Sequence, residues 1–395
     1  MTTKISSRRA SRRALKAIAA IACLTCSAGF ASAADNEAEL ELAVSAGWDS
    51  NPLDLPWDEE SSAFTSIDLD AALTSSWSPA ISGFARIDGT TRFFESDFSD
   101  ADLVLADTAL GIGWTPRING RRNVSIAFGV SYAVFRAAYV DPATGDVAFV
   151  QTGGSSQEEI RDRFDFDGVG GFMDLRWRAR PHLLAFLDVE YVERDFAEDY
   201  DELPTVEPLD ESSLRFKPGI RWLVSYNVAL DVTFEISRRE YDDLRALDQG
   251  ATPVDGSRRE YGYVGARISV RLQPTNSLNL AFGLRGTERD DTFAGYYDYE
   301  ATGLFASAGY GFGDRTRVRL SLSQRSIRYD QATIGNDPSL PLQENDTFRV
   351  LGRVERDLNE RFTWFVEASA ERADSRDPIY EYDRDWARSG VSFRL

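Results

Sequence analysis

Cysteine and histidine are scarce in this 395-residue chain, and their scarcity excludes several kinds of chemistry. The two cysteines, Cys23 and Cys26, lie in the first 33 residues, so the rest of the chain has no thiol for a disulfide, a nucleophile or a metal site. The one histidine, His182, directly follows Pro181 in an expected tight turn, which is a poor place for catalysis. No phosphate-binding loop, nucleophile elbow or metal-ligand spacing is present. We therefore expect no catalytic residue, no cofactor and no metal site, and a protein that is not an enzyme.

Positive charge is also in short supply, because 44 basic side chains face 64 acidic ones and the net charge is −20. Six of the bases lie in the first 33 residues, which contain no acid, so the remaining chain has 38 bases, 64 acids and a net charge of −26. Binding to nucleic acid through the phosphate backbone requires clustered cations. This composition therefore argues against a nucleic-acid partner.

Long apolar runs are missing after residue 33, where none approaches the roughly 18 residues that a transmembrane helix needs. The first 33 residues instead have the three parts of a signal peptide: a basic region ending at Lys16, an apolar stretch over Ala17–Leu24, and the Ala31-Ser32-Ala33 processing site. We expect residues 1–33 to be a cleaved signal peptide and residues 34–395 to be the exported domain. Such a domain is either soluble or a membrane β-barrel.

Apolar and polar residues alternate along most of the exported domain. Val228, Leu230, Val232, Phe234 and Ile236, for example, share one face of a period-two pattern, which is typical of a β-strand with two different faces. The pattern predicts 16 strands, over residues 39–49, 62–77, 82–95, 102–115, 122–136, 163–179, 183–195, 212–224, 227–240, 259–272, 277–289, 296–312, 316–329, 346–356, 361–372 and 382–395.

Short turns alternate with longer acidic connections between these strands. Ser78-Pro79 and Gly313-Asp314 are two of the tight-turn sequences. Outer-membrane barrels have short periplasmic turns and longer external loops, and an even strand count places both termini on one side. The sequence predicts an all-β fold, a single antiparallel transmembrane barrel of about 16 strands (14 to 18) with both termini periplasmic.

Aromatic residues collect next to the short turns, on the apolar face. In a barrel they would form a girdle at the periplasmic membrane interface, whereas a soluble sandwich gives tryptophan no reason to gather at one end of alternate strands. The predicted girdle consists of Trp77, Trp114, Trp177, Trp222, Phe312, Phe362 and Trp364.

The C-terminus carries a short motif. Arg388, Gly390, Phe393 and Leu395 resemble the insertion signal that the outer-membrane barrel assembly machinery reads, although the terminal leucine replaces the usual aromatic residue. In architecture the exported domain resembles the outer-membrane porins of proteobacteria, including those found beside exopolysaccharide-export systems. The resemblance implies a transport barrel in the outer membrane of a Gram-negative bacterium. Its implied partners are membrane lipid, lipopolysaccharide, the assembly machinery and polysaccharide-export components.

If the apolar faces contact lipid, the opposite faces line the interior and are rich in arginine. Such a lining would attract anionic or sugar-like solutes, or would form an arginine–carboxylate network that stiffens a watery lumen. The expected lining arginines are Arg86, Arg92, Arg176, Arg178, Arg194, Arg221, Arg267, Arg271, Arg285, Arg317, Arg319, Arg349 and Arg353.

The longest connection, about residues 137–162, contains Asp141, Asp146, Glu158 and Glu159. In general porins the loop at this position folds inward, so the resemblance implies a constriction loop; the alternative is an external loop. The expected function is a pore for small hydrophilic or anionic and saccharide solutes, with a link to polysaccharide export. The alternative is a non-conducting structural or surface-binding barrel.

Overall fold

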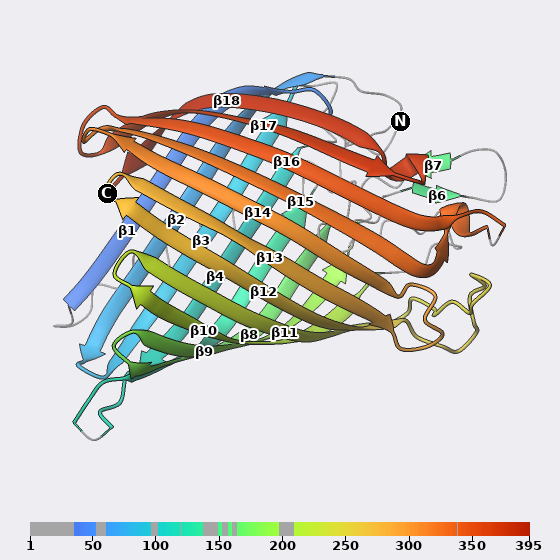
Figure 1. The fold of residues 1–395 in the computed structure, drawn as a ribbon, viewed down its shortest axis with the longest axis horizontal. Helices are drawn as coiled ribbons and strands as arrows, with labels where there is room; N and C mark the ends of the chain where they lie inside the picture. The colour runs from blue at the N-terminus through green and yellow to red at the C-terminus, as the bar shows by residue number, and fades with distance from the viewer. Residues whose placement is uncertain are drawn as a thin grey trace.

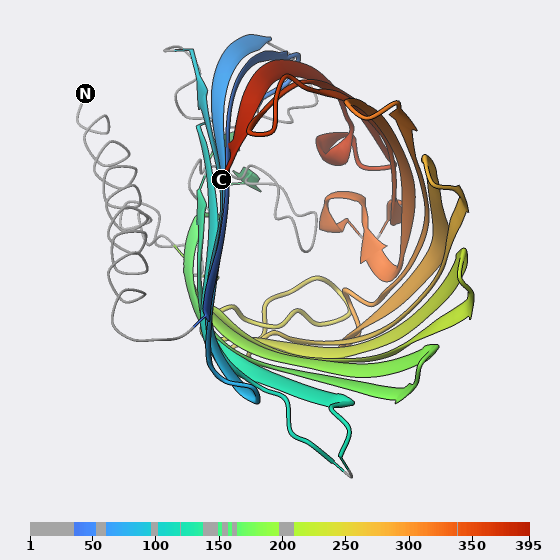
Figure 2. The ribbon, with the colours of Figure 1, turned by 90° about the vertical axis from the view of Figure 1, so that its left-hand side faces the viewer.

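Sixteen β-strands close into one antiparallel barrel in the computed structural model of the protein (Figures 1 and 2). The predicted signal peptide, residues 1–33, lies outside the described residues. Among the residues that are described, no helix is long and apolar enough to span a membrane. The structure describes residues 35–52, 61–95, 102–118, 120–136, 149–151, 157–159, 164–196, 209–337 and 339–395.

The predicted all-β, 16-strand fold is confirmed, and each strand boundary lies within four residues of its expected position. The barrel strands are β1 (Asp35–Asp49), β2 (Ser62–Ser78), β3 (Ile81–Phe94), β4 (Leu103–Trp114), β5 (Val124–Arg136), β8 (Phe166–Arg180), β9 (Leu183–Phe196), β10 (Glu211–Ser225), β11 (Val228–Tyr241), β12 (Glu260–Thr275), β13 (Leu278–Asp291), β14 (Tyr299–Phe312), β15 (Thr316–Thr333), β16 (Leu342–Asp357), β17 (Phe362–Ser375) and β18 (Tyr382–Arg394). A small separate hairpin, β6 (Phe149–Gln151) and β7 (Gln157–Glu159), lies in the longest connection.

Every barrel strand pairs with its neighbours in sequence, except that β5 pairs with β8 and β1 pairs with β18 to close the sheet. At this closing seam Glu41 lies opposite Arg394 and Asp49 lies opposite Trp386. Closure leaves the sheet without the free edges that promote aggregation. Since the strand number is even, β1 begins and β18 ends at the rim that carries the short turns.

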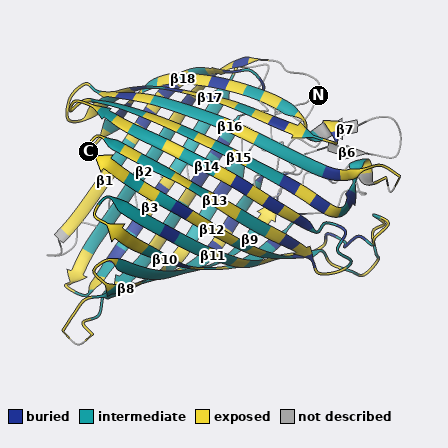
Figure 3. Ribbon diagram, in the orientation of Figure 1, coloured by how far each residue is buried: buried dark blue, intermediate teal, exposed yellow. Residues whose placement is uncertain are grey.

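Most of the outward face of the barrel consists of exposed apolar side chains. Exposed and less exposed residues alternate along the strands (Figure 3). Val130, Val169, Val264 and Leu284 have exposed fractions of 57–61%, and they lie on four different strands. A soluble protein would bury such a continuous apolar surface, whereas a transmembrane barrel presents it to lipid. The fold is therefore that of an outer-membrane-type barrel, in which the sheet satisfies its own backbone hydrogen bonds.

The short turns are stabilised by side chains that accept hydrogen bonds from the turn backbone. The hydroxyl of Ser78 accepts from the N–H groups of Ala80 (3.2 Å) and Ile81 (3.1 Å), and the amide oxygen of Asn359 accepts from Arg361 and Phe362 (both 2.9 Å). Serine and asparagine favour turns because their side chains can replace backbone partners in this way. This local chemistry explains why the short turns could be located in the sequence.

All seven aromatic residues of the predicted girdle lie near short turns and are exposed, with fractions from 38% at Trp364 to 59% at Trp77. An indole on the outside of a strand end is placed for the boundary between lipid and water. Their interfacial role remains a prediction. Another tryptophan, Trp386, is only 9% exposed and lies on the inward face beside Arg388 and Arg92.

Candidate pore lining

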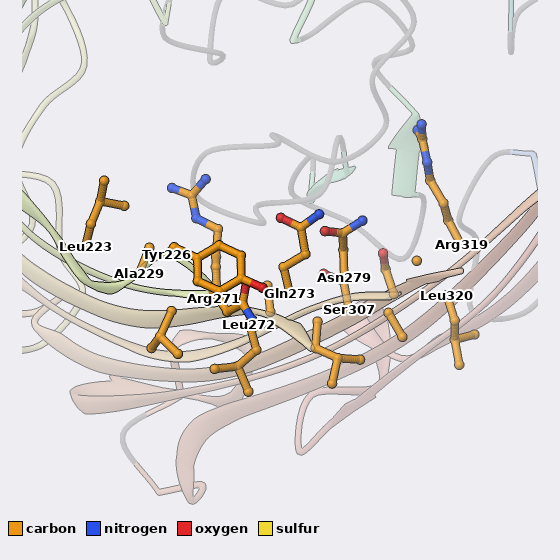
Figure 4. A pocket seen from close by; sticks show the side chains of 17 residues that line it. Leu223, Tyr226, Ala229, Arg271, Leu272, Gln273, Asn279, Ser307, Arg319 and Leu320 are labelled. Carbon is orange, nitrogen blue, oxygen red and sulfur yellow. The ribbon is translucent and has the colours of Figure 1, made fainter. Parts of the chain in front are cut away.

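The thirteen arginines predicted to line the interior all lie on the strand face opposite the exposed apolar residues, as strand alternation requires. Figure 4 shows this for two neighbouring pairs: the Arg271 and Arg319 side chains point to one side of the wall, and those of Leu272 and Leu320 point to the other. The residues nevertheless differ in what surrounds them, and they fall into three groups.

The first group closes the seam between β1 and β18. Asp49 is fully buried. Arg384 donates hydrogen bonds to the Asp49 carboxylate, from Nε to both oxygens at 3.1 Å and from Nη2 to Oδ2 at 2.7 Å. Arg92 on β3 reaches the same carboxylate at 3.5 Å. Arg388 on β18 spans β1 to reach Asp68 on β2 at 2.7 Å, and also holds Glu367 on β17 at 2.7 Å. Charge pairs thus join strands that come from opposite ends of the chain.

The second group consists of arginines that share carboxylates elsewhere on the wall. Arg221 and Arg271 both contact Asp231 at 2.6 Å, and one carboxylate therefore serves two cations. Glu355 is the common partner of three arginines, whose shortest distances to it are 3.1 Å for Arg317, 3.8 Å for Arg319 and 2.8 Å for Arg353. Arg194 shares Glu211 with Arg239, and single ion pairs join Arg176 to Asp188 and Arg349 to Glu371.

The third group has no ion-pair partner within the described part of the chain: Arg86, Arg178, Arg267 and Arg285. Two of these arginines form a row with a further one, Arg325. Arg267 lies directly opposite Arg285 across β12 and β13, and only Gly303 separates Arg285 from Arg325 on β15. The guanidinium of Arg267 stacks on Phe305 at 4.1 Å. We call Arg267, Arg285 and Arg325 the arginine row.

A row of carboxylates faces the arginine row from the other side of the barrel. Asp70 lies opposite Asp88 and Asp88 lies opposite Asp107, on β2, β3 and β4. All three are exposed, and none has an ion pair with another described residue. We call them the aspartate row. In the closed strand order β3 and β13 are eight strands apart in either direction, so the two rows lie on opposite walls.

The two rows also lie at similar depth. Asp88 and Arg285 are each seven residues beyond the first residue of their strands, Ile81 and Leu278, at the short-turn rim. Because Asp88 and Arg285 are both exposed, water reaches the wall at this depth, whereas the side chains of an eight-stranded barrel fill its interior.

Inward aromatic residues are the feature that the sequence analysis missed. Phe84, Gly111, Gly129 and Phe172 are successive neighbours across β3, β4, β5 and β8, and the two rings lean over the glycines until their centroids are 6.1 Å apart. The rings cover backbone that glycine leaves bare, which strengthens the sheet locally. The available signal was phenylalanine on a polar face beside glycines on the polar faces of adjacent strands.

The rim opposite the short turns carries packed connections. Arg289 is only 2% exposed, lies over the rings of Tyr261 (4.5 Å) and Tyr299 (4.2 Å), and donates a hydrogen bond from Nε to the carbonyl oxygen of Tyr297 at 2.9 Å. In the same connection burial raises the pKa of Asp298, whose carboxylate accepts a hydrogen bond from the Asp291 N–H at 2.6 Å.

The remaining predicted site residues are placed as follows. Asp141 and Asp146 lie outside the described residues, and Glu158 and Glu159 belong to β7, so the constriction loop stays a prediction. In the predicted assembly motif Arg388 points inward, Phe393 packs on Phe362 at 5.3 Å, and the Leu395 N–H donates to the Leu40 carbonyl at 2.9 Å. A Cβ atom at Gly390, the fourth motif residue, would collide with the β1 backbone. These contacts bring the last strand against β1 and β17.

Comparison with known proteins gives structural likeness only. No family model and no curated protein matches the chain. Among solved structures, it is similar to the outer-membrane protein OmpT of Vibrio cholerae (9% identity, TM-score 0.49, 92% of this chain and 99% of that one) and to an anion-selective porin from Comamonas acidovorans (7%, 0.49, 92% and 100%). A bacterial polysaccharide outer-membrane secretin is a third match (11%, 0.44, 91% and 97%). The assignment of the fold rests on the strand order of this chain itself.

Proposed function

We propose that the protein is a pore in the outer membrane of a Gram-negative bacterium, through which small hydrophilic solutes pass, with anionic and saccharide solutes favoured. The observation that carries the proposal is the pair of opposed rows, arginines on one wall and aspartates on the other, in which every side chain except the half-buried Arg325 is exposed. Residues 1–33 serve as the export signal, the exposed aromatic residues hold the barrel at the membrane interface, and the short-turn rim faces the periplasm.

The two rows are difficult to explain by stability alone. Like charges directly opposite each other on adjacent strands are destabilising. At the seam, by contrast, the chain places arginines beside carboxylates and gains charge-assisted hydrogen bonds. A barrel that keeps three arginines together on one wall and three aspartates together on the opposite wall loses that stabilisation. Groups of like charge that reduce stability in this way are expected at functional positions.

The rows would act on a solute through the electric field between them. Exposed charges on opposite walls of a water-filled passage orient a dipolar solute and attract an anion toward the arginine side. Asp231 adds to this bias, since two arginines contact this one carboxylate. An export role for acidic polysaccharide is compatible with the same wall.

Conductance of the purified protein in a planar lipid bilayer tests the proposal. Stable current steps, with a reversal potential that changes when the salt gradient is inverted, are the expected result. Protein that is folded by its heat-modifiable gel migration but gives no steps would refute the pore and favour a structural or surface-binding barrel.

A further inference from the structure

A hollow of about 510 Å³ lies on the inner wall near the short-turn rim, across β10 to β15, with Leu223 and Tyr226 at its β10 end (Figure 4). Its floor consists of small residues: Ala281, Ser307 and Ser321 lie in one lateral row beside Arg271, and Gly309 lies between Asn279 and Arg319 in the next. The wall is concave here because these side chains are short. The volume is in the range of about 300–1,000 Å³ that is typical of small-molecule sites.

Longer polar side chains surround this floor. Figure 4 shows Arg271, Gln273, Asn279 and Arg319 pointing into the same space from the wall. Among the described residues that line the hollow, none is acidic. The hollow therefore offers two guanidinium groups, two amides and the hydroxyls of Ser307 and Ser321.

The two arginines are not neutralised by their neighbours. Arg319 has a side chain that is 62% exposed, and its only ion-pair contact in the described part of the chain is 3.8 Å from Glu355, which Arg353 and Arg317 approach more closely. Arg271 shares Asp231 with Arg221, which leaves one positive charge uncompensated. The Arg319 guanidinium is therefore open to a further anion, and the unshared charge of the Arg221–Arg271 pair adds a positive potential beside it.

We infer that this hollow is a binding subsite for a polyhydroxylated carboxylate of the uronic-acid class. The inference rests on the proposed pore function and names a solute class for it. The Arg319 guanidinium matches a carboxylate with two parallel hydrogen bonds. The amides of Gln273 and Asn279 and the serine hydroxyls match ring hydroxyl groups, which both donate and accept. A neutral sugar lacks the charge, and a small anion such as acetate leaves the amides unused.

Calorimetric titration of the folded protein in detergent micelles tests the subsite, with glucuronate, glucose and acetate as the three probes. Glucuronate is expected to bind more tightly than either of the others. Arg319→Ala should weaken glucuronate binding about tenfold, equivalent to about 1.4 kcal/mol. Arg178→Ala is the matched control, because Arg178 is also an exposed inward arginine near the short turns but lies on β8, outside the hollow. It should leave the affinity unchanged.

A second variant separates sugar recognition from charge. Asn279→Ala keeps every charge, and it should weaken glucuronate binding while acetate binding stays the same. Equal binding of glucuronate and acetate, an equal effect of Arg319→Ala and Arg178→Ala, or no heat with glucuronate would each overturn the inference. The titration needs no current, so a closed barrel that binds glucuronate refutes the pore alone, and an open pore that does not bind it refutes the subsite alone.

Discussion

Asp49 is expected to be a principal support of the seam where the barrel closes. It lies at the end of β1, is fully buried, and contacts Arg384 on β18 and Arg92 on β3, whose side chains are 19% and 11% exposed. Asp49→Asn keeps the shape of the side chain but removes its charge. The two guanidinium groups then lose this carboxylate while they remain largely buried, and removing one partner of a buried ion pair costs about 3–5 kcal/mol.

Glu41→Gln is the matched control for this substitution. Glu41 also joins β1 to β18, through Arg394 at 2.7 Å, and the change is again from carboxylate to amide. The two side chains of this pair are 36% and 62% exposed, so its loss should cost less than about 1 kcal/mol.

Urea unfolding of the barrel in phospholipid vesicles, followed by tryptophan fluorescence, measures both effects. We expect a clear fall in the urea midpoint for Asp49→Asn and a small one for Glu41→Gln, with similar slopes. Equal, small shifts for the two variants would refute the reasoning that buried charge pairs hold the seam.

Three further predictions follow from single contacts. Gly129→Ala should lower the free energy of unfolding by about 1–3 kcal/mol, because the new Cβ would lie 2.8 Å from the Phe172 ring and would collide with the Leu110 carbonyl oxygen; Gly352→Ala, where nothing lies within 4 Å, is the control in the same urea assay. Asp298→Asn should stabilise the protein at neutral pH but not in strong acid. Burial raises the pKa of Asp298, so the stability that its protonated carboxyl provides is lost as the pH rises through that pKa. A difference in unfolding free energy between variant and parent that does not change with pH would contradict this. Brominated lipids should quench Trp77, which is 59% exposed, but not Trp386, in single-tryptophan variants, and equal quenching would place both on one face.

The strand pattern and the short turns could be predicted because both are local. Alternation over eight or more residues specifies which face of a strand is apolar, and a residue such as Ser78 or Asn359 forms its turn with groups only two or three positions away. The ends of the strands could be predicted only to within a few residues, because how far a strand extends beyond the membrane depends on its pairing with the neighbouring strand. β16, for example, begins at Leu342, four residues before its expected start.

The two charge rows could not be predicted, because they depend on the register between strands. Asp70, Asp88 and Asp107 are separated by 18 and 19 positions in the sequence, and a slip of one residue would move each to the other face. The inward Phe84 and Phe172 were missed for a related reason. Aromatic residues were expected on the lipid side, and the glycines that accommodate the two rings lie on other strands.

The central claim is that the arginine row and the aspartate row together set the passage of charged solutes through the barrel. The most direct test is the reversal potential in a salt gradient for two triple variants: Arg267→Ser, Arg285→Ser and Arg325→Ser in one, and Asp70→Asn, Asp88→Asn and Asp107→Asn in the other. We predict that the first shifts selectivity toward cations and the second toward anions, with conductance retained in both. The same reversal potential in both variants and in the unmodified protein would contradict the account.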